Sequence, residues 1–153
     1  MFKHILKLYS LKRTGATMGN DDNHLSPQQR KVLRDGATEA PGSGALLDNK
    51  QDGSYHCAAC NAKLFDSDTK FESKQAGLQG WPSFDQAIDG AIELKDDSSA
   101  FMHRTEAICA NCDGHLGHVF DAADSPSGTH FCINSCSLDF EDTEGNRTSG
   151  DSN

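Results

Sequence analysis

The sequence predicts a mainly β protein of one domain that begins with a single short helix, and three observations support this fold class. One segment near residue 26 carries the start and stop signals of a helix. From Tyr55 onward, short runs with strand character alternate with turn residues. The length of 153 residues suits one domain with a single core.

The expected helix starts at Ser26. This serine can cap the first turn, Pro27 suits the first helical position, and Gln29 completes a capping-box pattern. Gly36 is expected to end the helix. A loop rich in Gly, Pro and Ser follows.

Short strands separated by turns account for the remaining elements. The runs with strand character include Ala91–Lys95, Thr105–Ile108, His118–Asp121 and His130–Ser135. No apolar run approaches the roughly 20 residues that span a bilayer, so the sequence predicts no contact with a membrane interior.

The two ends of the chain look different from its body. Residues 1–19 carry four basic and no acidic residues, and their apolar residues recur at helical spacing. We expect a targeting peptide, which favours a mitochondrial over a cytoplasmic location, or else a disordered basic tail. Residues 20–140 form the expected domain, and residues 141–153 an expected disordered acidic tail.

The body of the protein is acidic. Beyond residue 19 it holds 10 basic and 23 acidic residues, and the whole chain has a net charge of −9. Nucleic-acid binding is excluded as a main role because phosphate contacts need a basic face. An enzyme or a protein-interaction module fits better, with a monomer as the default state.

Four of the six cysteines form two C-x-x-C pairs inside a weak internal repeat, C-A-x-C-[N/D]-x-x-L. The pairs are Cys57 with Cys60, and Cys109 with Cys112. A two-residue gap lets both thiolates of a turn face one cation, and Asn61 and Asp113 tolerate the left-handed backbone that such turns often need. Two such turns make the four-thiolate site that is usual for one structural zinc ion.

A closed site of this kind has no open position, so zinc is expected to hold the fold and do no chemistry. The alternatives are two redox-active pairs or two disulfides. Because Cys60 and Cys109 lie far apart in the sequence, the metal is expected to join distant hairpins.

Cys132 stands outside both pairs, in a run with strand character. Residues at i and i+2 of a strand share a face, so His130, Cys132 and Asn134 should point one way, and Phe131 and Ile133 into the core. Polar neighbours can stabilise a thiolate. The pattern leaves open a reactive thiol and a buried, inert one.

Two further motifs are candidates for the lining of a cleft. Gly114–Phe120 holds His115 and His118 in a glycine-rich stretch, although single histidines are more often plain surface or core residues. Gly80–Phe84 holds Trp81, the only tryptophan of the chain. That side chain is either a wall for a substrate or a plug in the core.

Together these motifs resemble the methionine sulfoxide reductase type B family. They occur in the family's order and spacing, and a G-A-T-E run at 36–39 matches its leader. The likeness covers roughly residues 25–140. The matching motifs are GWPSF (80–84), HRTE (103–106), the two CxxC pairs, HLGHVF (115–120) and FCINS (131–135).

The resemblance implies two antiparallel sheets, known as a β-tent, and reduction of the R epimer of methionine sulfoxide. It implies that oxidised proteins or free methionine R-sulfoxide are substrates, that thioredoxin or a small thiol is the reductant, and that the activity repairs oxidative damage. The positions that match family site residues are Cys132 as nucleophile, His115, His118 and Asn134 as further catalytic residues, and Trp81, Phe84 and His103 on the substrate side.

The expected chemistry is attack by the Cys132 thiolate on the electrophilic sulfoxide sulfur. A histidine, His118 directly or through water, supplies the proton, and Cys132 becomes a sulfenic acid. Trp81 favours the methyl group on one side of the sulfur while polar donors favour the oxygen on the other, which can select one epimer.

The sequence departs from the family pattern at Gln79, where a cysteine is frequent, and at His130, where an arginine is common. Cys136 is a possible resolving cysteine. However, four residues of extended strand span about 13 Å, whereas a disulfide needs Cα atoms within about 7 Å. We therefore expect Cys136 to be a small core residue and Cys132 to be reduced by an external thiol.

Two other functions compete with the enzyme. One is a non-catalytic β-tent zinc scaffold that binds a partner protein, and the other is a redox sensor that uses Cys132 and Cys136. A scaffold has no need of Cys132, HLGHVF and GWPSF together, and this combination favours the enzyme.

Overall fold

The structure is a computed structural model that describes residues 22–98, 104–123 and 125–152. The targeting segment expected at 1–19 and the candidate residue His103 lie outside these ranges. Within them, no helix is long and apolar enough to cross a bilayer.

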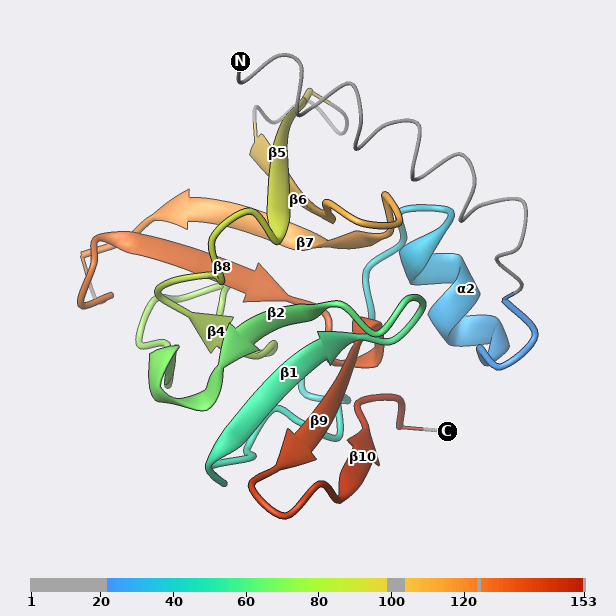
Figure 1. Ribbon diagram of the computed structural model, residues 1–153. Helices are drawn as coiled ribbons and strands as arrows, with labels where there is room; N and C mark the ends of the chain where they lie inside the picture. The colour runs from blue at the N-terminus through green and yellow to red at the C-terminus, as the bar shows by residue number, and fades with distance from the viewer. Residues whose placement is uncertain (1–21, 99–103, 124, 153) are drawn as a thin grey trace, which may run out of the picture.

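Two antiparallel sheets and one α-helix make up the described part of the fold (Figure 1), which confirms the mainly β, two-sheet class. The strand order is β10-β9-β1-β2 in one sheet and β3-β4-β8-β7-β6-β5 in the other. The elements are α2 (Pro27–Leu33), β1 (Gly53–Cys57), β2 (Lys63–Asp66), the 3-10 turn η1 (Ser67–Thr69), β3 (Lys70–Phe71), β4 (Ser83–Phe84), β5 (Ile92–Asp97), β6 (Arg104–Cys109), β7 (His115–Asp121), β8 (Thr129–Ile133), the 3-10 turn η3 (Ser135–Ser137), β9 (Leu138–Asp142) and β10 (Arg147–Ser149).

The capping box that the sequence predicts starts helix α2. The Ser26 hydroxyl accepts from the Gln29 backbone N–H at 3.1 Å, and the Gln29 side chain accepts from the Ser26 backbone N–H at 2.8 Å. Gly36 has a left-handed φ of 75° just beyond the helix. The Gln29 amide also donates to the Cys136 carbonyl at 3.3 Å, which ties the helix to η3.

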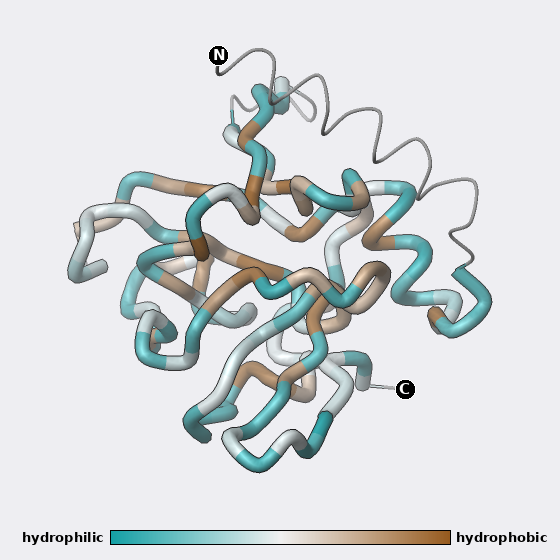
Figure 2. Tube along the Cα trace, viewed as in Figure 1, coloured by the Kyte–Doolittle hydropathy of each residue, from teal (hydrophilic) through white to brown (hydrophobic). Residues whose placement is uncertain are grey.

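The core lies between the facing sides of the two sheets. Figure 2 shows hydrophobic residues along β2, β8 and β7, whereas the outer turns are mostly hydrophilic. Phe84 of β4 stacks on Phe65 of β2 with ring centroids 4.1 Å apart and meets Tyr55 of β1 edge-on at 5.0 Å. Aromatic contacts therefore join one sheet to the other.

The expected place of Phe84 on the substrate side is wrong. This side chain has 0% exposure and is enclosed by core aromatics. Because Phe84 pairs with Phe131 across β4 and β8, it lies on the core face of its sheet. Within the GWPSF motif, Phe84 therefore belongs to the core, whereas Trp81 lines the cavity described below.

The expected disordered tail at 141–153 is also corrected. Strand β9 continues to Asp142 and a turn follows. Strand β10 then pairs antiparallel with β9, so that Arg147 lies opposite Glu141. The Gly150 carbonyl accepts from the Ser135 hydroxyl at 2.7 Å. Composition suggested disorder because the hairpin's side chains are mostly polar, but backbone pairing needs no apolar side chains.

Replacing Phe84 by alanine should lower the free energy of unfolding by about 3–5 kcal/mol, because the cavity left between the sheets cannot collapse fully. Denaturant unfolding followed by circular dichroism measures this change. A variant of unchanged stability with only a raised KM would show that Phe84 is a substrate residue after all.

Candidate active site and metal centre

The two C-x-x-C pairs meet at one end of the sheets. The first turn links β1 to β2 and the second links β6 to β7. The Sγ atoms of Cys57 and Cys112 are 3.7 Å apart, those of Cys60 and Cys109 are 3.6 Å apart, and all four lie within 4.8 Å of one another. Zinc–sulfur bonds of about 2.3 Å give a tetrahedron with edges of about 3.8 Å, so this donor set fits zinc.

The backbone of both turns supports the cluster in the same way. Asn61 and Asp113, with φ of 70° and 64°, are the only non-glycine residues with positive φ in the described chain. Their N–H groups donate to the carbonyls of Cys57 and Cys109 at 2.8 Å in each case. The left-handed turns that the sequence predicts are therefore confirmed, and a bound ion would join the two sheets.

Substituting Cys112 by serine should abolish stoichiometric zinc binding and destabilise the whole domain, because the binding energy of a structural metal contributes to folding. Elemental analysis and thermal unfolding measure the two effects. A variant that keeps both its zinc and its stability would contradict a four-thiolate site.

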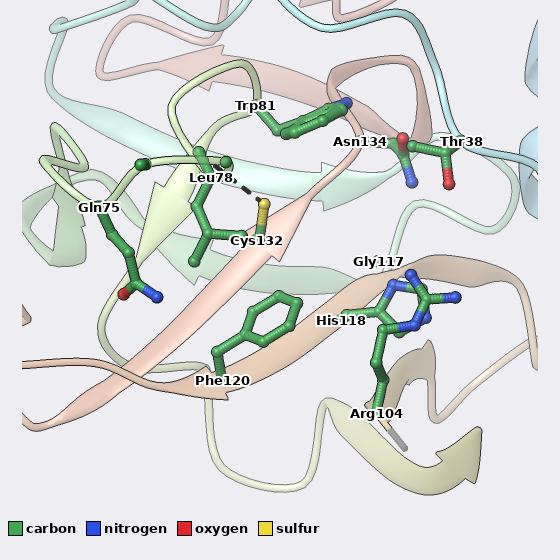
Figure 3. A pocket seen from close by; sticks show the side chains of 12 residues that line it. Thr38, Gln75, Leu78, Trp81, Arg104, Gly117, His118, Phe120, Cys132 and Asn134 are labelled. Atoms are coloured by element: carbon green, nitrogen blue, oxygen red, sulfur yellow. Dashed lines mark hydrogen bonds between the residues drawn. The ribbon is translucent and has the colours of Figure 1, made fainter. Parts of the chain in front are cut away.

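A separate cavity of about 340 Å³ opens over β7 and β8 (Figure 3). Figure 3 shows the Cys132 sulfur between Leu78 and Trp81 on one side and Phe120 and His118 on the neighbouring strand. The lining residues are Thr38, Gln75, Ala76, Gly77, Leu78, Trp81, Arg104, Gly117, His118, Phe120, Cys132 and Asn134.

Strand register explains why His118 and Cys132 share this cavity. They lie directly opposite each other in the antiparallel pair β7/β8. Opposite residues project to the same face with Cβ atoms about 4.5–5.5 Å apart. Phe131 and Ile133 project to the other face, against the core, as the alternation in the sequence predicts.

A β-bulge brings the second histidine to the same side. Residues three apart in a regular strand point to opposite faces, but the register shifts between Ala107 and Ile108, so that Gly117 and His115 lie opposite consecutive residues. The rings of His115 and His118 are consequently 5.4 Å apart. The glycine-rich stretch is thus a bulged strand.

His115 does not line the cavity. It is 5% exposed, and its Nδ1 hydrogen-bonds the Glu106 carboxylate. His115 therefore lies behind His118, where it can support that ring but has no direct access to a ligand in the cavity.

The surroundings of His118 favour its neutral form. Burial lowers the pKa of His118, and the nearby charge of Arg104 lowers it further, while the hydrogen bond to Asp97 opposes both. His118 Nε2 lies 2.9 Å from Asp97 Oδ2. A carboxylate only accepts, so Nε2 carries the proton and Nδ1 remains a base.

The Cys132 thiol is protonated at rest. Burial, with a contribution from the negative charge of Glu39, raises the pKa of Cys132 to about 12. The thiol donates to the Leu78 carbonyl over a long distance of 4.0 Å, and a carbonyl can only accept from it. The expected stabilisation of a thiolate by polar neighbours on β8 is therefore not present in this state.

His130 cannot supply that stabilisation. It is fully buried, with Nε2 2.7 Å from the Ser83 hydroxyl and its ring 5.0 Å from that of Phe71. These contacts are with side chains of β4 and β3 of the same sheet, and His130 is not among the residues that line the cavity. Arg104, from β6, is the charged lining residue instead.

Asn134 and Trp81 stand at the cavity with their polar groups already engaged. The Asn134 amide donates to the Leu116 carbonyl at 3.0 Å and accepts from the Glu39 N–H at 2.9 Å. The Trp81 Nε1–H donates to the Glu39 carbonyl at 3.0 Å. Trp81 therefore offers the cavity its apolar surface, as a substrate wall would.

Cys136 lies in the core with 0% exposure, in agreement with its expected role as a small core residue. Its backbone N–H donates to Glu39 Oε1 at 3.0 Å. Burial and the Glu39 charge raise the pKa of the Cys136 thiol. A resolving role would require this buried, protonated thiol to leave the core.

Sequence reasoning passed over several residues that shape the cavity. Thr38, Arg104 and Phe120 line it, and Asp97 orients His118. Thr38 belongs to the G-A-T-E run, Arg104 to HRTE and Phe120 to HLGHVF, but the sequence predicts no role for these three residues themselves. Strand alternation was the available signal for Phe120, which stands two residues beyond His118 and shares its face.

A separate cysteine opposite a histidine in an apolar cavity, on a fold with four clustered thiols, is the arrangement of an enzyme with a cysteine nucleophile. The SelR domain model matches residues 25–142. The chain is 50% identical over 121 residues to the peptide methionine sulfoxide reductase MsrB of Methanosarcina barkeri, covering 78% of this chain and 82% of the relative. It is 50% identical over 118 residues to the MsrB of Leptospira interrogans serogroup Icterohaemorrhagiae serovar Lai, covering 76% and 87%. This chain therefore belongs to the methionine sulfoxide reductase B family.

Among solved structures, the Mis18 'Yippee-like' domain matches with a TM-score of 0.41 and 18% identity, covering 54% of this chain and 89% of that domain.

Alkylation of Cys132 in the resting protein should accelerate about ten-fold per pH unit above neutrality, because the thiolate fraction rises with pH until it approaches a pKa of about 12. Mass spectrometry of iodoacetamide-treated protein follows the reaction at this residue. A rate that levels off near pH 7 would show that the resting cysteine is already a thiolate.

Proposed function

We propose that this protein reduces the R epimer of methionine sulfoxide in oxidised proteins by forming a sulfenic acid on Cys132. The observation that carries the proposal is the position of Cys132 opposite His118 in a cavity with an apolar wall. The peptide substrates named for the relatives above support it. Free methionine R-sulfoxide presents the same reacting group and is expected to enter the same cavity.

We expect the Cys132 thiol to lose its proton only when substrate is bound, because the thiol is protonated at rest. His118 is neutral with an unprotonated Nδ1, and it lies opposite Cys132 in the antiparallel strand pair β7/β8. We expect Nδ1 to take the thiol proton as the sulfur attacks and to pass it to the sulfoxide oxygen, directly or through water. One histidine then acts as both base and acid, held in place by Asp97.

The first half-reaction balances without another reactant. A bond forms between the Cys132 sulfur and the substrate, the sulfoxide oxygen transfers to that sulfur, and the thiol proton ends on the same oxygen. The products are methionine, reduced by two electrons, and a sulfenic acid on Cys132. Trp81 and Phe120 supply apolar surface for the methyl group, which orients the sulfoxide oxygen toward the polar side.

The second half-reaction needs an external reductant. Two thiols, from thioredoxin or a small dithiol, reduce the sulfenic acid, and a disulfide and water leave. Cys136 is not proposed as the resolving residue because it is buried. Repair of oxidised proteins follows as the cellular role, and a mitochondrial site of action remains the expectation from residues 1–19.

The four-cysteine cluster is proposed to hold one structural zinc ion. Cys57, Cys60, Cys109 and Cys112 would bind it. With four thiolates the ion has no position open for substrate. Its contribution is to fix the ends of β1 and β6, and every chemical step remains with the residues of the cavity.

An epimer-resolved assay tests the proposal. With dithiothreitol present, the wild-type protein should convert methionine R-sulfoxide to methionine and leave the S epimer unchanged. Cys132→Ser should lose all measurable turnover because serine cannot accept the oxygen. Chromatography of derivatised methionine reads out both results.

Cys136→Ser is the matched control, since it removes a thiol that lies in the core and should retain most turnover. Loss of turnover in this variant, with folding and zinc content intact, would transfer the resolving role to Cys136. A wild-type protein that binds zinc but reduces neither epimer would instead support the scaffold function.

A further inference from the structure

Glu39 is a buried acid whose role the chemistry above leaves unassigned. It is 4% exposed and lies in the loop between α2 and β1. Asp and Glu are almost never fully buried unless they are paired or hydrogen-bonded, because desolvation of a carboxylate is costly. Burial accordingly raises the pKa of Glu39. Its contacts show what offsets this cost.

The backbone of Glu39 holds two residues of the cavity at once. Its N–H donates to Asn134 Oδ1 at 2.9 Å, and its carbonyl accepts from Trp81 Nε1 at 3.0 Å. Asn134 and Trp81 come from segments about 50 residues apart in the chain, and Glu39 is a common partner of both. The preceding residue, Thr38, lines the cavity itself.

The side chain of Glu39 fixes this backbone to the end of the catalytic strand. Its Oε2 accepts from the Ser135 N–H at 2.7 Å and its Oε1 from the Cys136 N–H at 3.0 Å. Both donors belong to η3, which follows β8 after the single residue Asn134. A carboxylate suits this position because it offers two acceptors, whereas an amide offers only one.

The space around the carboxylate is closely filled. A Cβ added at Gly44 would lie 2.9 Å from Glu39 Oε2 and would overlap the Ser135 side chain. The 39–46 loop therefore closes over Glu39, and Leu46 N–H also donates to the Ser135 hydroxyl at 2.9 Å. Glu39 has little room to take another position.

We propose that Glu39 is the positioning residue of the reductase cavity, where it fixes the Trp81 indole and the Asn134 amide around the Cys132 thiol. It acts through these residues and touches no substrate. The expected effect on turnover rests on the proposed function, whereas the effects on Trp81 and Cys132 do not. The negative charge of Glu39 contributes to the raised pKa of Cys132. The pKa of Cys132 therefore reports, independently of turnover, on whether this charge is in place.

The test compares Glu39→Gln with the wild-type protein. Glutamine keeps the size but leaves one N–H of η3 without an acceptor, so the loop should loosen. Because Trp81 is the only tryptophan, fluorescence excited selectively at tryptophan reports on it alone. We expect its emission to move to longer wavelength as the indole loses the Glu39 carbonyl and gains water.

Two further measurements separate positioning from general destabilisation. Turnover number should fall about ten-fold with KM changed much less, since positioning affects the transition state more than binding. The pH profile of Cys132 alkylation should move to lower pH, because removing a negative charge favours the thiolate. Zinc content and near-UV circular dichroism establish that the variant is folded.

Glu141→Gln is the matched control. It removes a surface carboxylate of β9 that pairs with Arg147 at 2.8 Å, and it should leave the emission, the alkylation profile and the turnover unchanged. Glu39→Asp retains the charge but shortens the side chain. It should therefore shift the emission while leaving the alkylation profile close to that of the wild-type protein.

Unchanged emission and an unchanged alkylation profile in folded Glu39→Gln would overturn the proposal, whatever the activity. Failure of both Glu39 variants to fold and bind zinc would also overturn it, by making Glu39 a residue of the fold as a whole. If the emission and alkylation shift as expected while the wild-type protein reduces no methionine sulfoxide, the positioning role stands and the proposed function fails.

Discussion

The close approach of β7 to β8 at Gly117 is the constraint on which the cavity depends. A Cβ at this position would overlap the carbonyl oxygen of Cys132, so only glycine permits the observed backbone pairing. That pairing sets His118 opposite Cys132. A shift of one residue would send the thiol into the core and an apolar side chain into the cavity.

The second organising element is the pair of C-x-x-C turns. Each lies where a strand of one sheet turns back toward its neighbour, β1 to β2 and β6 to β7 (Figure 1), and the four thiols of the two turns lie within 4.8 Å of one another. The aromatic contacts of Phe84 with Phe65 and Tyr55 fill the space that this arrangement encloses. The clustered thiols and the apolar packing thus both connect the sheet that carries β7 and β8 to the other sheet.

Features with a local cause could be predicted from the sequence. The capping box at Ser26, the left-handed turns at Asn61 and Asp113, and the alternation around Cys132 each depend on residues that lie close together in the chain. Features set by distant partners could not. The burial of Phe84 depends on β1 and β2, the raised pKa of Cys132 depends on the depth of the cavity, and nothing local predicts either. Composition likewise failed at β10, because backbone pairing at an edge leaves polar side chains in solvent.

The burial of the Cys132 sulfur, which keeps the thiol protonated at rest, has a consequence for the survival of the protein. Peroxides attack thiolates and react slowly with neutral thiols, and the products beyond a sulfenic acid are irreversible in most proteins. A sulfur that keeps its hydrogen between turnovers is shielded from the same oxidants that damage its surroundings. The cavity therefore favours durability at rest over standing nucleophilicity.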